Sequence, residues 1–174
     1  MNGFILALRK EEEEKMSTME MPKPQVEHGF LERMVGLWEV TSTSMGHDEK
    51  WVEVCRSLNG IWFVAEGSGE MPGGGGPATT ILTLGYDPAK GRYVGTWLGT
   101  MMNHLWVYEG EVSDDGSTLN LYTTGPDFAN PGKTGDYREQ IIFTDDDHRT
   151  FNSSSKQPDG TWQQFMEAHY ARKR

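Results

Sequence analysis

Turn motifs recur along the chain at intervals too short for crossover helices, and this spacing constrains the fold more than any other feature. Asn59-Gly60 is the strongest of these motifs, because a type I′ hairpin turn requires positive φ at both central residues and Asn and Gly tolerate it best. Further turns are predicted at 87–91, 114–116, 145–147 and 158–160. Connections this short join antiparallel neighbours, so the sequence predicts an antiparallel meander.

The segments between the turns have the length and alternation of β-strands. Apolar side chains recur at every second position in three places: Leu82, Leu84 and Tyr86; Leu119 and Leu121; and Trp162, Met166, Ala168 and Tyr170. The predicted strands are 37–45, 49–58, 61–70, 78–86, 92–99, 104–113, 117–124, 134–144, 148–155 and 161–171. A meander of about ten strands removes its two unpaired edges by closing, so we expect an all-β, up-and-down closed barrel.

Two predicted strands carry apolar side chains on both faces. In 104–113 one face has Trp106 and Tyr108 while the other has Leu105 and Val107, and 61–66 is similarly mixed. An outer face with apolar side chains is typical of a surface covered by a second subunit, so a homodimer is expected.

The first residues differ in character from the rest. Residues 1–24 combine a run of glutamates with prolines, which predicts a flexible N-terminal extension, and 25–174 are expected to form one barrel domain. A short helix is predicted from Val26, with Val26, Phe30 and Met34 on one face and Gly36 at its end. This helix would lie at one end of the barrel.

The formal net charge of −10, with no basic cluster, argues against nucleic acid or an anionic membrane surface as a partner. Cys55 is the only cysteine, so neither an intramolecular disulfide nor a thiolate zinc cage can form. With no recognisable signal sequence and no run long enough for a membrane span, we expect a cytoplasmic protein. Neither a metal nor another cofactor is expected.

Several short motifs add a family resemblance to this interpretation. Gly36-Leu37-Trp38 opens the first predicted strand after a short helix. Further motifs are Leu84-Gly85-Tyr86-Asp87-Pro88, Tyr93-Val94-Gly95-Thr96-Trp97, Leu105-Trp106-Val107-Tyr108-Glu109-Gly110, Asp145-Asp146-Asp147-His148-Arg149 and Tyr170-Ala171-Arg172. Together they resemble an uncharacterised bacterial family, a domain of unknown function in the lipocalin-like calycin superfamily, across about 25–173.

The resemblance implies a barrel without an established activity. It also implies structural roles for Gly36, Trp38 and Arg172, with the arginine of the last strand packed over the tryptophan at the closed end of the barrel. Nitrobindin-like haem proteins are a related calycin group, but residues 66–70 do not reproduce their glycine-rich strand motif.

Aromatic residues on the central strands are the candidate ligand site. Trp62, Tyr86, Trp97, Trp106 and Tyr108 could line a cavity for a small apolar or aromatic ligand, with His104 or Arg138 fixing its orientation. Glycines at 67, 69, 95, 99 and 110 would thin the walls and leave volume. The alternative is a barrel filled by these same rings.

The remaining candidate features indicate little chemistry. Glu109 and Glu111 share a strand face, which suits either an acid/base pair or a solvated surface, and no catalytic residue is assigned. The glycine-rich stretch within 71–77 predicts a loop that could act as a lid. Four functions remain open, in this order: small-molecule binding, a structural or interaction role with a filled core, an unassigned enzyme, and haem binding.

Overall fold

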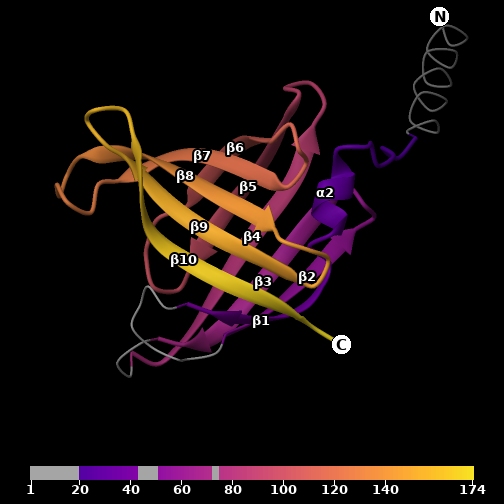
Figure 1. Cartoon of the computed structure of the whole chain (residues 1–174), viewed down its shortest axis with the longest axis horizontal. Coiled ribbons are helices and arrows are strands. Elements are labelled where there is room, and N and C mark those ends of the chain that lie inside the picture. The colour runs from indigo at the N-terminus through magenta and orange to yellow at the C-terminus, as the bar shows by residue number, and fades with distance from the viewer. Residues whose placement is uncertain (1–19, 43–50, 72–74) are drawn as a thin grey trace, which may run out of the picture.

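The computed structural model describes residues 20–42, 51–71 and 75–174, and in this part of the chain ten strands and one short helix form a closed antiparallel barrel (Figure 1). The helix is α2 (His28–Glu32). The strands are β1 (Gly36–Thr41), β2 (Trp51–Leu58), β3 (Trp62–Glu70), β4 (Pro77–Asp87), β5 (Arg92–Gly99), β6 (Trp106–Val112), β7 (Thr118–Pro126), β8 (Thr134–Phe143), β9 (His148–Lys156) and β10 (Trp162–Lys173).

Each strand pairs with its neighbours in sequence, and β1 closes the sheet by pairing with β10. The predicted all-β closed barrel is therefore confirmed. The predicted strand at 104–113 begins later, at Trp106. Part of the predicted strand at 37–45, and the predicted extension up to residue 19, lie outside the described residues.

The turn predicted at Asn59-Gly60 has the backbone that its residues favour. Asn59 has φ of 55° and Gly60 has φ of 72°, between β2 and β3. Positive φ at both positions is the requirement of a type I′ turn, so the local preference and the strand pairing agree.

The helix lies against one end of the barrel (Figure 1). Phe30 and Met34 are buried as predicted, and the hydroxyl of Tyr93 on β5 donates a hydrogen bond to the carbonyl oxygen of Glu27 at 2.7 Å. Val26, which was predicted on the same face as Phe30 and Met34, is 88% exposed, so that part of the prediction is wrong. The helix begins only at His28, and Val26 precedes the periodic segment.

The first and last strands pair at the helix end, where the family resemblance implies that Arg172 packs over Trp38. The guanidinium of Arg172 lies 4.2 Å from the centre of the Trp38 ring, and it donates hydrogen bonds to the carbonyl oxygens of Val35 and Arg33. Gly36 has φ of 139°, and a Cβ there would lie 2.5 Å from Arg172 Nη1. A side chain at Gly36 would therefore strain the backbone and displace the guanidinium.

Strand alternation places most of the predicted core correctly. Leu82, Leu84, Leu119 and Leu121 are all buried inside the barrel. Trp162 is the exception: it packs with Tyr122 and Arg138 on the outer surface instead of sharing a face with Ala168. A β-bulge between Gln164 and Met166 adds a residue to β10 and reverses the alternation there.

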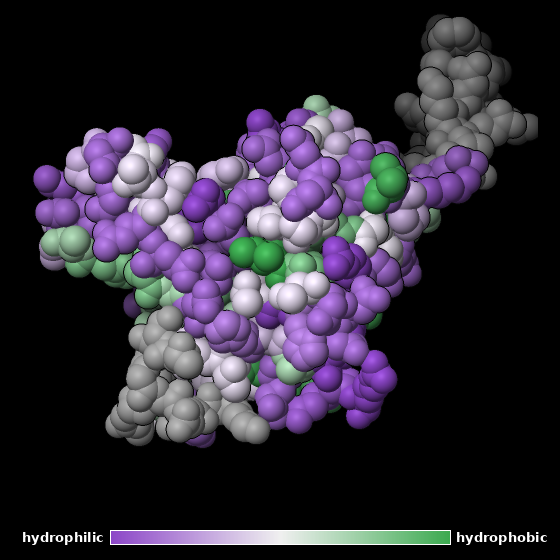
Figure 2. All heavy atoms as spheres, in the orientation of Figure 1, coloured by the Kyte–Doolittle hydropathy of each residue, from purple (hydrophilic) through white to green (hydrophobic). Residues whose placement is uncertain are grey.

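The outer surface combines polar and apolar regions. Over β8, β9 and β10 it is mainly hydrophilic (Figure 2), whereas Val54 on β2 and Val107 on β6 are exposed apolar residues elsewhere on the barrel. The homodimer stays a prediction. In the described part of the chain, none of the helical structure is long and apolar enough to cross a membrane.

Candidate functional site

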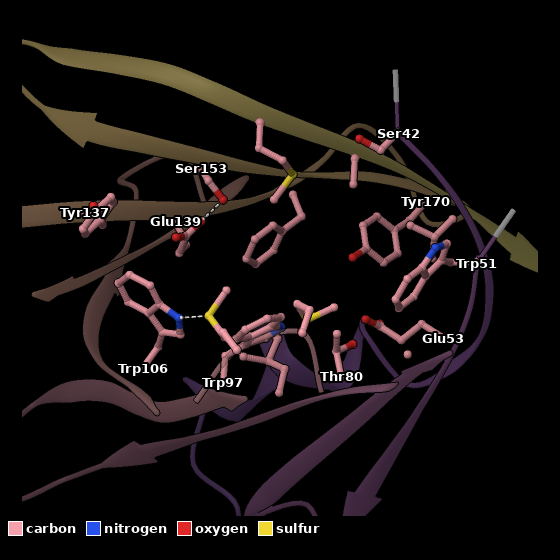
Figure 3. Close-up of a pocket in the computed structure, with 18 of the residues that line it drawn as sticks. Ser42, Trp51, Glu53, Thr80, Trp97, Trp106, Tyr137, Glu139, Ser153 and Tyr170 are labelled. Atoms are coloured by element: carbon pink, nitrogen blue, oxygen red, sulfur yellow. Dashed lines mark hydrogen bonds between the residues drawn. The ribbon is translucent and has the colours of Figure 1, made fainter. Parts of the chain in front are cut away.

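A cavity of about 330 Å³ lies inside the barrel (Figure 3). Its apolar wall includes Trp97, Met102, Trp106, Tyr108, Phe151 and Ala168. Polar side chains that line it include Ser42, Glu53, Thr80, Glu139, Arg149 and Ser153. Strand alternation produces this site, because successive inward positions of several strands converge on one interior.

The end of the barrel opposite α2 provides the rim of the cavity. Four apolar residues at this end line the cavity: Met71 follows β3, Met101 follows β5, Phe128 follows β7, and Phe165 lies at the β10 bulge. Phe128 and Phe165 are more than half exposed. Apolar side chains from four segments therefore surround this end of the cavity.

Three of the predicted aromatic residues meet in this cavity. Trp97, Trp106 and Tyr108 all line it. Trp106 and Tyr108 are buried at alternate positions of β6, with exposed Val107 between them. The indole N–H of Trp106 donates to the sulfur of Met102 at 3.1 Å. That contact fixes the orientation of one aromatic wall.

Two predicted aromatic residues do not line the cavity. Trp62 is 44% exposed and lies over Gly85 on the outer face, where an added Cβ would be 2.4 Å from the indole. Tyr86 points inward, but it packs against His28 and Tyr93 at the helix end. The glycine-to-indole packing explains the first error, and the position of Tyr86 near the end of β4 explains the second.

The two predicted orienting residues also lie outside the lining. Arg138 is on the outer face, with its guanidinium 5.1 Å from the centre of the Trp162 ring. His104 precedes β6 and contacts the edge of Trp106 at 4.7 Å between ring centres. The inward polar residue of β8 is therefore Glu139, the neighbour of Arg138.

The glycines contribute less volume than predicted, because Gly67 is the only one of the five that lines the cavity. At Gly95 an added Cβ would lie 2.0 Å from the carbonyl oxygen of Thr83, so this glycine allows close strand approach. At Gly69 the space is filled by Trp51.

A buried ion pair at the inner end of the cavity was not predicted. Arg149 on β9 donates to Glu53 on β2, and its guanidinium lies 3.7 Å from the centre of the Tyr170 ring and 4.9 Å from that of Trp38. Burial raises the pKa of Glu53, and the charge of Arg149 opposes that rise. Glu53 lies two residues from Cys55, so both side chains point to the same, inner face of β2. This spacing was the sequence signal that could have predicted an inward carboxylate.

A second buried carboxylate lies farther along the cavity wall. Glu139 on β8 is 7% exposed and accepts a hydrogen bond from the hydroxyl of Ser153 on β9 (Figure 3). Burial raises the pKa of Glu139 to about 7, although the Ser153 hydrogen bond lowers it. Glu139 lies two residues from both Tyr137 and Ile141, which are buried, so strand alternation predicts an inward side chain here as well.

Glu139→Gln is expected to stabilise the free protein above pH 7. The folded state holds the proton on Glu139 more tightly than the unfolded state, so wild-type stability falls as the pH rises from about 4.5 to about 7. Above pH 7 this loss of stability reaches about 3 kcal/mol, and the glutamine variant does not suffer it because glutamine carries no charge. Urea unfolding at pH 4 and pH 8 measures the effect.

Glu66→Gln is the matched control, because Glu66 is an exposed strand glutamate on the outer face of β3. It should change stability little at either pH. Equal effects of the two substitutions at pH 8 would show that Glu139 is not held in a low-polarity environment.

The other predicted features do not add to the site. Glu109 and Glu111 are exposed and pair with Lys90 and Arg92, which fits a solvated face.

Burial raises the pKa of Cys55 to about 12, which leaves its thiol unreactive. In the described part of the chain, no cluster of three or more His, Cys, Asp or Glu could hold a metal. The predicted lid includes 72–74, which lie outside the described residues.

The chain was compared with known families and structures. A family model described as "Protein of unknown function (DUF1579)" matches residues 23–172. No curated protein matches the chain.

Solved barrels resemble the chain at low identity. The S-type phycobiliprotein lyase CPES from Guillardia theta is 19% identical with a TM-score of 0.48, covering 86% of this chain and 93% of that one. A redesigned β-barrel is 12% identical with a TM-score of 0.42, covering 82% and 94%. The redesigned barrel mFAP1 bound to DFHBI is 14% identical with a TM-score of 0.38, covering 82% and 96%.

Proposed function

Since the chain belongs to the family described as protein of unknown function (DUF1579), we propose a function from its own interior: the barrel binds a small, largely apolar molecule. The aromatic body of the ligand would lie between Trp97, Trp106 and Tyr108. Those residues would supply contact area, and the buried polar groups would select among ligands of similar size.

The observation that carries the proposal is the cavity of about 330 Å³. This volume is within the range of small-molecule sites, and most of its wall is apolar. A barrel with a purely structural role would be expected to fill its interior with its own side chains. The exposed apolar rim supports the same function, because it provides an entrance.

Filling the cavity should abolish binding. Ala168 on β10 is buried in the cavity wall, so Ala168→Phe would place a ring in the space proposed for the ligand. We expect wild-type protein to enhance the fluorescence of N-phenyl-naphthylamine, a neutral apolar probe, in a saturable way. Ala168→Phe should weaken that binding by about 10-fold or more.

Val107→Phe is the matched control, because it places the same aromatic ring at an exposed position on the outer face of β6. It should bind the probe as wild type does, and circular dichroism should show a folded barrel for both variants. Absence of saturable enhancement with the wild type, or equal binding by folded Ala168→Phe, would contradict the proposed site.

A further inference from the structure

We propose that the ligand is an amphipathic amine whose protonated nitrogen pairs with Glu139 while its apolar body fills the aromatic part of the cavity; this inference rests on the proposed binding function. The chemical class is a monocation with one basic nitrogen and an apolar group of one or two rings or a short chain. Glu139 and Ser153 form the polar part of this site.

The geometry provides a carboxylate with a free side toward the cavity. Glu139 lines the cavity between two buried neighbours of β8, and Ser153 donates to one of its two oxygens, Oε2. A carboxylate has about four acceptor sites, so one hydroxyl leaves most of them available. Within the described residues, no lysine, arginine or histidine forms an ion pair with Glu139.

The charges that face the cavity favour a cation. Glu53 from β2 and Arg149 from β9 pair with each other and neutralise one another. The other titratable lining groups are the phenols of Tyr108, Tyr137 and Tyr170, which are neutral near pH 7. Ionised Glu139 therefore leaves a net charge of −1 on the described lining, which a monocationic ligand would balance.

The cost of burying the Glu139 carboxylate also favours a cationic ligand. A buried carboxylate without a counter-charge is costly, whereas an ammonium group can restore the lost hydration with charge-assisted hydrogen bonds. Burial has already raised the pKa of Glu139 to about 7. A bound cation would lower that pKa again, so amine binding should strengthen as the pH rises through about 7 while the amine remains protonated.

The test compares two ligands of nearly equal shape. The probes are para-butylbenzylamine, which is cationic at pH 8, and para-butylbenzyl alcohol, which is neutral. Each displaces N-phenyl-naphthylamine from the full chain. We expect the wild type to bind the amine about 10-fold more tightly than the alcohol at pH 8 and to lose this preference by pH 5.

Three variants assign the preference to Glu139. Glu139→Gln should bind the alcohol as wild type does and show no preference for the amine. Ser153→Ala removes the hydroxyl that stabilises the ionised carboxylate, so the pH midpoint of amine binding should move upward. Glu66→Gln removes one charge from the outer face and should retain the full preference.

The outcomes separate the two proposals. If N-phenyl-naphthylamine shows no saturable binding to the wild type, the binding function fails. If it binds but the amine does not displace it at pH 8, the amine proposal fails while the binding function stands. If the alcohol binds as well as the amine to wild type at pH 8, or if folded Glu139→Gln keeps the preference, the amine proposal fails while the binding function stands. If Glu139→Gln does not fold, an unchanged pH midpoint in Ser153→Ala overturns the proposal.

Discussion

Arg149→Met is expected to lower the free energy of unfolding by about 3–5 kcal/mol at neutral pH. Methionine has similar volume but no charge, so the substitution leaves Glu53 buried without its counter-ion. The loss should be smaller at pH 5, because protonation of Glu53 removes the uncompensated charge. Urea unfolding followed by tryptophan fluorescence at both pH values measures the change.

The double variant Glu53→Gln with Arg149→Met provides the control. It removes both charges, so it should recover much of the stability lost in the single variant. A loss below about 1 kcal/mol for Arg149→Met alone would contradict a desolvated ion pair. So would a double variant no more stable than the single one.

Trp38→Ala should destabilise the barrel by about 3–5 kcal/mol. The indole is fully buried, donates a hydrogen bond to the carbonyl oxygen of Met34 at 2.8 Å, and contacts the guanidinium groups of Arg149 and Arg172. Its removal leaves a void in the layer that closes the helix end. Chemical denaturation of the folded variant measures the cost.

Trp62→Ala is the matched control, because Trp62 lies on the outer face and is 44% exposed. Its cost should be clearly smaller. In a double-mutant cycle, Trp38→Ala and Arg172→Ala should show a coupling of about 1–2 kcal/mol. Zero coupling, or equal costs for the two tryptophans, would contradict the role assigned to the closed end.

Strand order could be predicted from this sequence because its signals are local. Asn59 and Gly60 specify a turn by their backbone preferences, and short connections require antiparallel neighbours. The error at Trp162 has a nonlocal cause. A bulge depends on how β10 pairs with β9, and two-residue alternation cannot detect the extra residue.

The candidate site could be predicted only in part. Trp97, Trp106 and Tyr108 line the cavity as predicted, because large aromatic residues are concentrated on the central strands. The pattern did not show which face of 104–113 points inward, since Leu105 and Val107 make the other face apolar as well. Glu53 and Glu139 were missed as interior groups because a charged residue on a strand is usually solvent-exposed. Their burial depends on partners far away in sequence, such as Arg149 and Ser153.

The indole N–H resonances of the tryptophans provide the most direct test of a ligand inside the barrel. Trp97 and Trp106 line the cavity, while Trp62 and Trp162 lie on the outer surface. In a ¹⁵N correlation spectrum, assigned with Trp→Phe variants and titrated with para-butylbenzyl alcohol, we expect saturable shifts of the Trp97 and Trp106 signals and stationary Trp62 and Trp162 signals. Unmoved cavity signals, or shifts confined to Trp62 and Trp162, would contradict a ligand-binding interior.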